Sequence, residues 1–108
     1  MAEFLDSETI PWRPVRPEIT REISGKTLLD GPTKAVLTRV APGGKFAPHR
    51  DPYAHLFYVL EGEGRVSAGT EERAVGPGSV VRVPAGELHG YENTGTEEMI
   101  LLSLNLPE

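Results

Sequence analysis

Glycine and proline punctuation constrains the fold of this chain more than any other feature. The 108 residues include 12 Gly and 10 Pro, which recur between short apolar runs. Such punctuation is typical of short strands joined by tight turns in all-β sandwiches and barrels. The sequence shows no segment with a clear helical pattern. We therefore expect an all-β protein.

Nine short strands are expected from the alternating apolar runs, at 26–29, 34–40, 46–49, 55–60, 65–68, 71–75, 79–83, 89–93 and 98–105. The segments 61–64 and 69–70 contain glycine and predict tight hairpin turns. The segment 75–78 predicts a sharp corner, because its glycines can take positive φ. This order predicts a meandering, closed double sheet.

The three histidines of the chain and one aspartate are candidate metal ligands. His49, Asp51 and His55 are separated by even numbers of residues, so they share a face wherever a strand is regular. His55 opens the apolar run 56–60, which would hold its ring on a rigid strand. Pro52 favours a loop or bulge, so strand alternation alone does not place His55 on the same face as Asp51.

Two glycine-anchored stretches, 43–62 and 78–93, resemble the two signature motifs of the cupin family. The second stretch matches its motif at every position, with Gly78, Pro84, Gly86, His89 and Asn93. The first matches at Gly43, His49 and Gly62, but Asp51 stands where the family has a second His and His55 stands where it has Glu. The resemblance covers about half of the chain. It implies a small single-domain cupin, whose fold is a double-stranded β-helix or jelly-roll barrel.

This resemblance implies that His49, Asp51, His55 and His89 converge inside the barrel and hold a divalent transition metal. Three His and one Asp keep the formal charge of the family's set of three His and one Glu. Imidazole and carboxylate without thiolate suit Fe, Ni, Mn, Cu or Zn, and the sequence does not choose among them. Asp51 is short, so direct ligation, a bridging water and orientation of a His ligand stay open. The competing interpretation is a barrel without metal and with ordinary pocket histidines.

Residues 1–23 are expected to form a Pro-rich N-terminal arm, and residues 24–108 the barrel domain. The segment 10–17 holds three prolines and the single Trp of the chain. Such segments are often linkers, but Trp12 would anchor this one on the barrel or on a second subunit. A homodimer is expected, because a chain of this size gains from additional burial.

Charge and composition narrow the partners. The net charge of −5 comes from interspersed acids and bases, without the basic stripe that nucleic-acid binding requires. There is no Cys, which excludes disulfides and thiolate ligands. No secretion signal and no run of roughly 20 apolar residues is evident, so we expect a cytoplasmic protein with no membrane partner.

Side chains near the candidate ligands suggest a small-molecule site. Phe57 and Val59 follow His55, and Tyr91 follows His89, at even spacing, so all three are candidates to line the ligand cavity, although plain barrel filling is the alternative. Tyr91 and Tyr53 are the candidate catalytic groups, since a hydroxyl could donate a proton to a bound substrate. We expect a metal-dependent cupin acting on a small organic molecule by oxygenase, isomerase or lyase chemistry. The alternatives are a non-catalytic cupin module that binds a small ligand or a metal, and a metal-free structural cupin.

Overall fold

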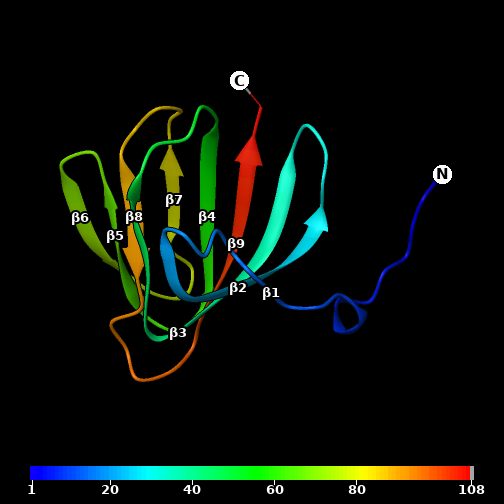
Figure 1. Ribbon diagram of the computed structural model, residues 1–108, viewed down its shortest axis with the longest axis horizontal. Coiled ribbons are helices and arrows are strands. Elements are labelled where there is room, and N and C mark those ends of the chain that lie inside the picture. The colour runs from blue at the N-terminus through cyan, green and yellow to red at the C-terminus, as the bar shows by residue number, and fades with distance from the viewer. Residues whose placement is uncertain (108) are drawn as a thin grey trace.

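Two long strands pass from one β layer to the other in this computed structural model, which describes residues 1–107 (Figure 1). They are β2 (Thr20–Leu29) and β3 (Lys34–His49). The remaining elements are the 3-10 turn Ser7–Thr9, β1 (Arg13–Pro14), β4 (Ala54–Glu61), β5 (Gly64–Ala68), β6 (Glu71–Val75), β7 (Val80–Val83), β8 (His89–Glu92) and β9 (Met99–Leu106). The expected all-β fold is confirmed.

Strand β3 joins the two layers. Its first half, from Lys34 to Val40, pairs with β9, and its second half pairs with β8. The strand bends between these halves, where Gly43 has a φ of 79° that side chains other than glycine rarely adopt. One layer therefore runs β6-β5-β8-β3, and the other runs β3-β9-β4-β7.

Strict alternation on β4 explains which side chains enter the space between the layers. His55, Phe57 and Val59 are buried, whereas Tyr58 and Leu60 are exposed on the outer face. The same inward-facing pattern on the other strands completes one apolar core, formed by Ile23, Val40, Phe46, Phe57, Val59, Val66, Val75, Val83, Tyr91, Met99 and Leu101. The core fills one end of the space between the layers and leaves the other end for polar side chains.

The N-terminal segment packs along β2. Strand β1 pairs antiparallel with β2, and Val15 contacts the core. The Trp12 ring lies 4.8 Å from Lys26 Nζ and 4.0 Å from Arg39 Cζ, which are cation–π distances. Residues 1–10 lead away from the sheets in Figure 1. This packing makes residues 13–16 part of the wall around the interior.

Candidate metal centre

Four side chains from three segments, three of them buried and His49 nearly so, meet between the layers. His49 ends β3 and His89 begins β8, and the two residues are paired across these strands. His55 lies on β4 in the opposite layer, and Asp51 lies in the loop before it. Side-chain exposure is between 2% and 10% for all four. The structure thus places the three histidines and Asp51 close together between the layers.

The loop that carries Asp51 is fixed by backbone contacts. The Gly86 N–H donates a 2.8 Å hydrogen bond to the Asp51 carbonyl oxygen, and Gly86 has a φ of 82°. Asn93 fixes a second loop, because its amide donates to the carbonyl oxygens of Val40 and Glu97. Gly86 of the second motif thus holds the backbone beside the site, whereas Asn93 holds the loop at the other end of β8.

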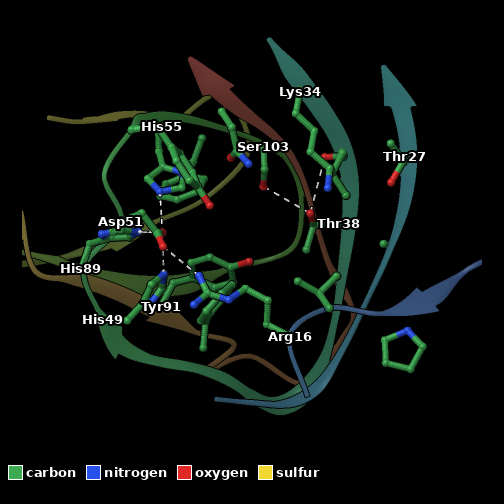
Figure 2. Close-up of a pocket in the computed structure, with 18 of the residues that line it drawn as sticks. Arg16, Thr27, Lys34, Thr38, His49, Asp51, His55, His89, Tyr91 and Ser103 are labelled. Atoms are coloured by element: carbon green, nitrogen blue, oxygen red, sulfur yellow. Dashed lines mark hydrogen bonds and ion pairs between the residues drawn. The ribbon is translucent and has the colours of Figure 1, made fainter. Parts of the chain in front are cut away.

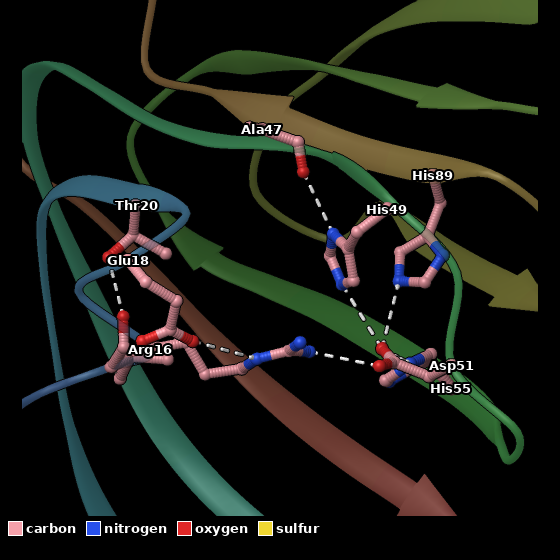
Figure 3. Close-up of polar contacts among 9 residues, drawn as sticks. Arg16, Glu18, Thr20, Ala47, His49, Asp51, His55 and His89 are labelled. Atoms are coloured by element: carbon pink, nitrogen blue, oxygen red, sulfur yellow. Dashed lines mark hydrogen bonds and ion pairs between the residues drawn. The ribbon is translucent and has the colours of Figure 1, made fainter.

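The Asp51 carboxylate lies among the three imidazoles (Figure 3). Its Oδ2 is 2.9 Å from His55 Nε2, 3.1 Å from His49 Nε2 and 3.8 Å from His89 Nε2. Two ligand atoms bound at 2.0–2.1 Å from one ion are about 3 Å apart at right angles and about 4.2 Å apart on opposite sides. The spacing around Oδ2 fits the spacing of neighbouring ligands on one ion.

Hydrogen bonds to the backbone set the tautomers of two histidines. His49 Nδ1–H donates to the Ala47 carbonyl at 2.8 Å, and His89 Nδ1–H donates to the Glu87 carbonyl at 2.9 Å. Both Nε2 atoms then carry lone pairs, and that of His89 is buried without a hydrogen-bond partner among the described residues. A lone pair that faces a carboxylate oxygen repels it unless a ring proton or a metal ion lies between them, and one metal ion would serve both histidines, so these residues fit a metal ion.

His55 is arranged differently. Its Nε2 lies at hydrogen-bond distance from Asp51 Oδ2, and its buried Nδ1 has no hydrogen-bond partner within residues 1–107. The tautomer with the proton on Nε2 satisfies this geometry, because Nε2–H then donates to the carboxylate. The group whose donor atoms all lie within 4.8 Å of one another contains His49, Asp51 and His89, but not His55. Ligation by His55 stays a prediction.

Arg16 is a site residue that the sequence reasoning missed. Its Nη1 donates a 2.9 Å hydrogen bond to Asp51 Oδ1, from the segment that follows β1 (Figure 3). Burial would raise the pKa of Asp51, but the hydrogen bonds from His55 and Arg16, together with the charges of His49 and Arg16, outweigh burial and lower this pKa. Asp51 is therefore a carboxylate at neutral pH. An arginine in a proline-rich arm gave no sequence signal of this contact.

A cavity of about 320 Å³ opens onto the four residues (Figure 2). Phe57, Tyr91 and Tyr53 line it. Val59, which we predicted to line it as well, is 2% exposed and belongs to the core instead, because it lies two residues further along β4. Away from Asp51 the cavity is polar and carries Thr27, Lys34, Thr38 and Ser103, and Asn105, which pairs with His55, adds a polar side chain beside the site.

Both candidate catalytic tyrosines stay protonated at neutral pH. Burial raises the pKa of Tyr91 far above its usual value. Burial, followed by the nearby Asp51 charge, also raises the pKa of Tyr53. Their hydroxyls can donate a hydrogen bond or a proton, but neither serves as a base at neutral pH.

Comparison with known protein families shows which family has this fold and these motifs. The family model described as a cupin domain matches residues 36–105, which is more than half of the chain. The chain belongs to the cupin family. The matched region includes all four candidate ligands, whereas Arg16 lies outside it. A comparison with curated proteins gave no match.

Solved structures share this cupin fold. The polyketide cyclase RemF from Streptomyces resistomycificus is 25% identical, with a TM-score of 0.88 over 100% of this chain and 81% of that one. A predicted oxalate decarboxylase from Thermotoga maritima is 19% identical, with a TM-score of 0.90 over 98% and 100% of the two chains. KdgF from a Halomonas species is 21% identical, with a TM-score of 0.83 over 100% and 96%. Within residues 1–107, no helix has the length and apolar character to cross a membrane.

Proposed function

We propose that this cupin is a metal-dependent enzyme that acts on a small organic molecule. One observation carries the proposal: the Nε2 atoms of His49 and His89 present lone pairs toward the Asp51 carboxylate in a buried site. Two acceptors and an anion facing one another are unfavourable until a cation enters. A cavity of about 320 Å³ beside them falls within the usual size range of small-molecule sites.

The proposed ligands are His49, Asp51 and His89. Asp51 contributes Oδ2, because Oδ1 is engaged by Arg16. His55 donates to the same Oδ2 and orients the carboxylate, and an inward shift of its ring would make it a fourth ligand. A divalent ion bound here would supply Lewis-acid or redox chemistry at its open coordination positions.

The surrounding side chains orient and shield the substrate. Phe46 and Phe57 give the cavity two apolar walls that exclude water from the reacting groups. Tyr91 is the proposed hydrogen-bond donor to the substrate, because burial raises its pKa and keeps its hydroxyl protonated, and its ring lines the cavity. Tyr53 offers the same group closer to Asp51.

Two observations favour different reaction types. Two histidines with one carboxylate is the ligand set typical of non-haem Fe(II) oxygenases, which favours oxygenase chemistry. Two similar structures, those of a polyketide cyclase and a predicted oxalate decarboxylase, favour isomerase or lyase chemistry instead. Oxygen uptake with the iron-loaded protein separates the two, because only oxygenase chemistry consumes O₂.

A non-catalytic module that binds a small ligand or a metal is the second candidate. It is favoured by the cavity lining: apart from the proposed metal site itself, the described part of the wall carries no carboxylate or imidazole that could act as a base at neutral pH. Turnover of any substrate would decide against this candidate.

The experiment is metal analysis of protein purified without a histidine tag, followed by product screening against small acids, phenols and sugars. Stoichiometric metal with turnover supports the enzyme, and metal with ligand binding but no turnover supports the binding module. Protein that takes up no Fe, Ni, Mn, Cu or Zn when each is offered overturns the metal-dependent enzyme and the metal-binding module, and leaves only a module that binds a small ligand.

The proposed assembly is a homodimer. Tyr58 on β4 and Val80 on β7 are paired neighbours on the outer face and are 40% and 58% exposed. With Leu60, also exposed on β4, they form an apolar outer face. Covering this face with a second copy would remove apolar surface from water.

A further inference from the structure

The charges that line the cavity differ from those of the whole chain. The chain carries 16 acidic and 11 basic residues. The cavity wall reverses this balance, since Arg13, Arg16 and Lys34 line it and Asp51 is its single carboxylate among the described residues. The interior is thus cationic in an acidic protein.

Arg16 is held in a position that favours a role in binding. Its φ is 41°, in the left-handed region that non-glycine residues rarely occupy, and such outliers gather at functional sites. The side chain is 42% exposed while its partner Asp51 is 6% exposed, so the guanidinium spans from the solvent edge to the buried centre. This conformation keeps a positive charge beside the proposed metal ligands.

The guanidinium of Arg16 retains free donors. Nη1 donates to Asp51 Oδ1, and Nε lies 3.6 Å from Glu18 Oε1. Nη2 makes no hydrogen bond with any residue of the described chain. A planar guanidinium has five N–H donors in a fixed fork, which matches the two oxygens of a carboxylate. The remaining donors are available to an anion in the cavity.

The net charge of the proposed metal site also favours an anionic ligand. Neutral His49 and His89, ionised Asp51 and a divalent ion sum to +1, and Arg16 raises this to +2 at the inner end of the cavity. A net charge in a partly buried site is costly unless a ligand neutralises it. Phe46, Phe57 and Tyr91 provide apolar and aromatic surface beside this charge.

We propose that the cavity binds a small carboxylate with a flat apolar body, and that Arg16 selects it by binding the carboxylate group. This inference names the substrate class of the proposed metal-dependent function and rests on it. The aromatic walls hold the body, Arg16 binds the anionic end, and Arg13 and Lys34 attract the anion toward the opening.

The test compares benzoate with the neutral isostere benzamide by calorimetric titration of metal-free and zinc-loaded protein. We expect benzoate to bind at least about tenfold more tightly than benzamide, because charge-assisted hydrogen bonds exceed neutral ones in strength. Arg16→Gln should bring this ratio close to one in the metal-free protein, where no ion contributes to anion binding. Arg16→Lys should keep part of the preference.

Arg65→Gln is the matched control. Arg65 is 43% exposed, pairs with Glu72 at 2.7 Å and lies outside this cavity. It should leave the benzoate preference unchanged, and thermal unfolding should show both variants folded. Equal affinity for the two probes, binding of neither, or an unchanged ratio in Arg16→Gln overturns the inference even if metal binds. An Arg16-dependent preference in a protein that takes up no metal overturns the proposed function alone.

Discussion

Replacing Asp51 by Asn separates direct metal ligation from a supporting role. The substitution keeps the shape of the side chain and removes its charge. Asp51 is 6% exposed, and its two oxygens contact Arg16 and all three histidines. In the metal-free protein the amide oxygen can still accept from Arg16, and the amide N–H₂ can donate toward the histidine lone pairs. We therefore expect the variant to fold.

The metal affinity should fall much further than the stability. Loss of a partner that only orients a metal ligand typically reduces affinity by about 10–100-fold. The 3.1 and 3.8 Å distances from Asp51 Oδ2 to the Nε2 atoms of His49 and His89 fit three ligands on one ion, which predicts direct ligation by Asp51. The reduction should therefore exceed about 100-fold, or roughly 2.7 kcal/mol of binding free energy.

Competition with a chelator of known affinity measures this reduction, using zinc or cobalt. Glu72→Gln is the control, because Glu72 also pairs with an arginine but is 60% exposed and lies outside the cavity. It should bind metal as the wild type does. A reduction of about 100-fold or less in Asp51→Asn would refute direct ligation, and with it the three-residue ligand set.

Three further predictions concern the stability and assembly of the chain. Gly62→Ala should lower the free energy of unfolding in urea by about 2–5 kcal/mol, because Gly62 has a φ of 80° and a Cβ would lie 2.7 Å from Met99 Cα. Gly78→Ala should lower it by only about 1–2 kcal/mol, because Gly78 has a φ of 90° but open space around it. Equal costs would contradict the steric argument. Burial lowers the pKa of His89 below its ordinary value of 6.5, so at acidic pH the unfolded chain binds more protons than the folded protein. The melting temperature of the metal-free protein should therefore fall as the pH drops below about 6.5. His89→Gln should weaken this pH dependence. Replacing Tyr58 and Val80 by Lys should shift the mass measured by light scattering from dimer to monomer; an unchanged dimer would place the interface elsewhere.

The fold could be predicted from local patterns where alternation is regular. The apolar run after His55 predicted β4 and its inward face, and the glycines at 61–64 and 69–70 predicted the turns around β5. The strands expected at 34–40 and 46–49 are instead one strand, β3, because the chain bends at Gly43 without leaving the sheet. Strand β2 begins at Thr20, earlier than expected, and Glu22 has a φ of 58° at a shift in its register. Such irregularities depend on pairing with a distant strand, which local sequence does not encode.

The candidate site likewise contains residues that local sequence patterns predict and one residue, Arg16, that they do not. The motif spacing identified the three histidines and Asp51, since these residues lie on or beside regular strands. The contact of Arg16 with Asp51 spans 35 residues and depends on the pairing of β1 with β2. Alternation and motif spacing describe neighbours along one strand, so neither could predict a side chain that reaches Asp51 from another segment.

The position of Asp51 shows how a short side chain can serve where the family has a longer one. An aspartate on a regular strand has little reach, but Asp51 lies in a loop whose carbonyl is fixed by the Gly86 N–H. Arg16 holds Oδ1, so Oδ2 is left facing the imidazoles of both layers. The loop thus supplies the reach that the side chain lacks, and Arg16 supplies its orientation. In the proposed metal site, the exchange of carboxylate and imidazole between the two motif positions would therefore depend on Arg16 of the N-terminal arm, which lies outside the region that matches the family.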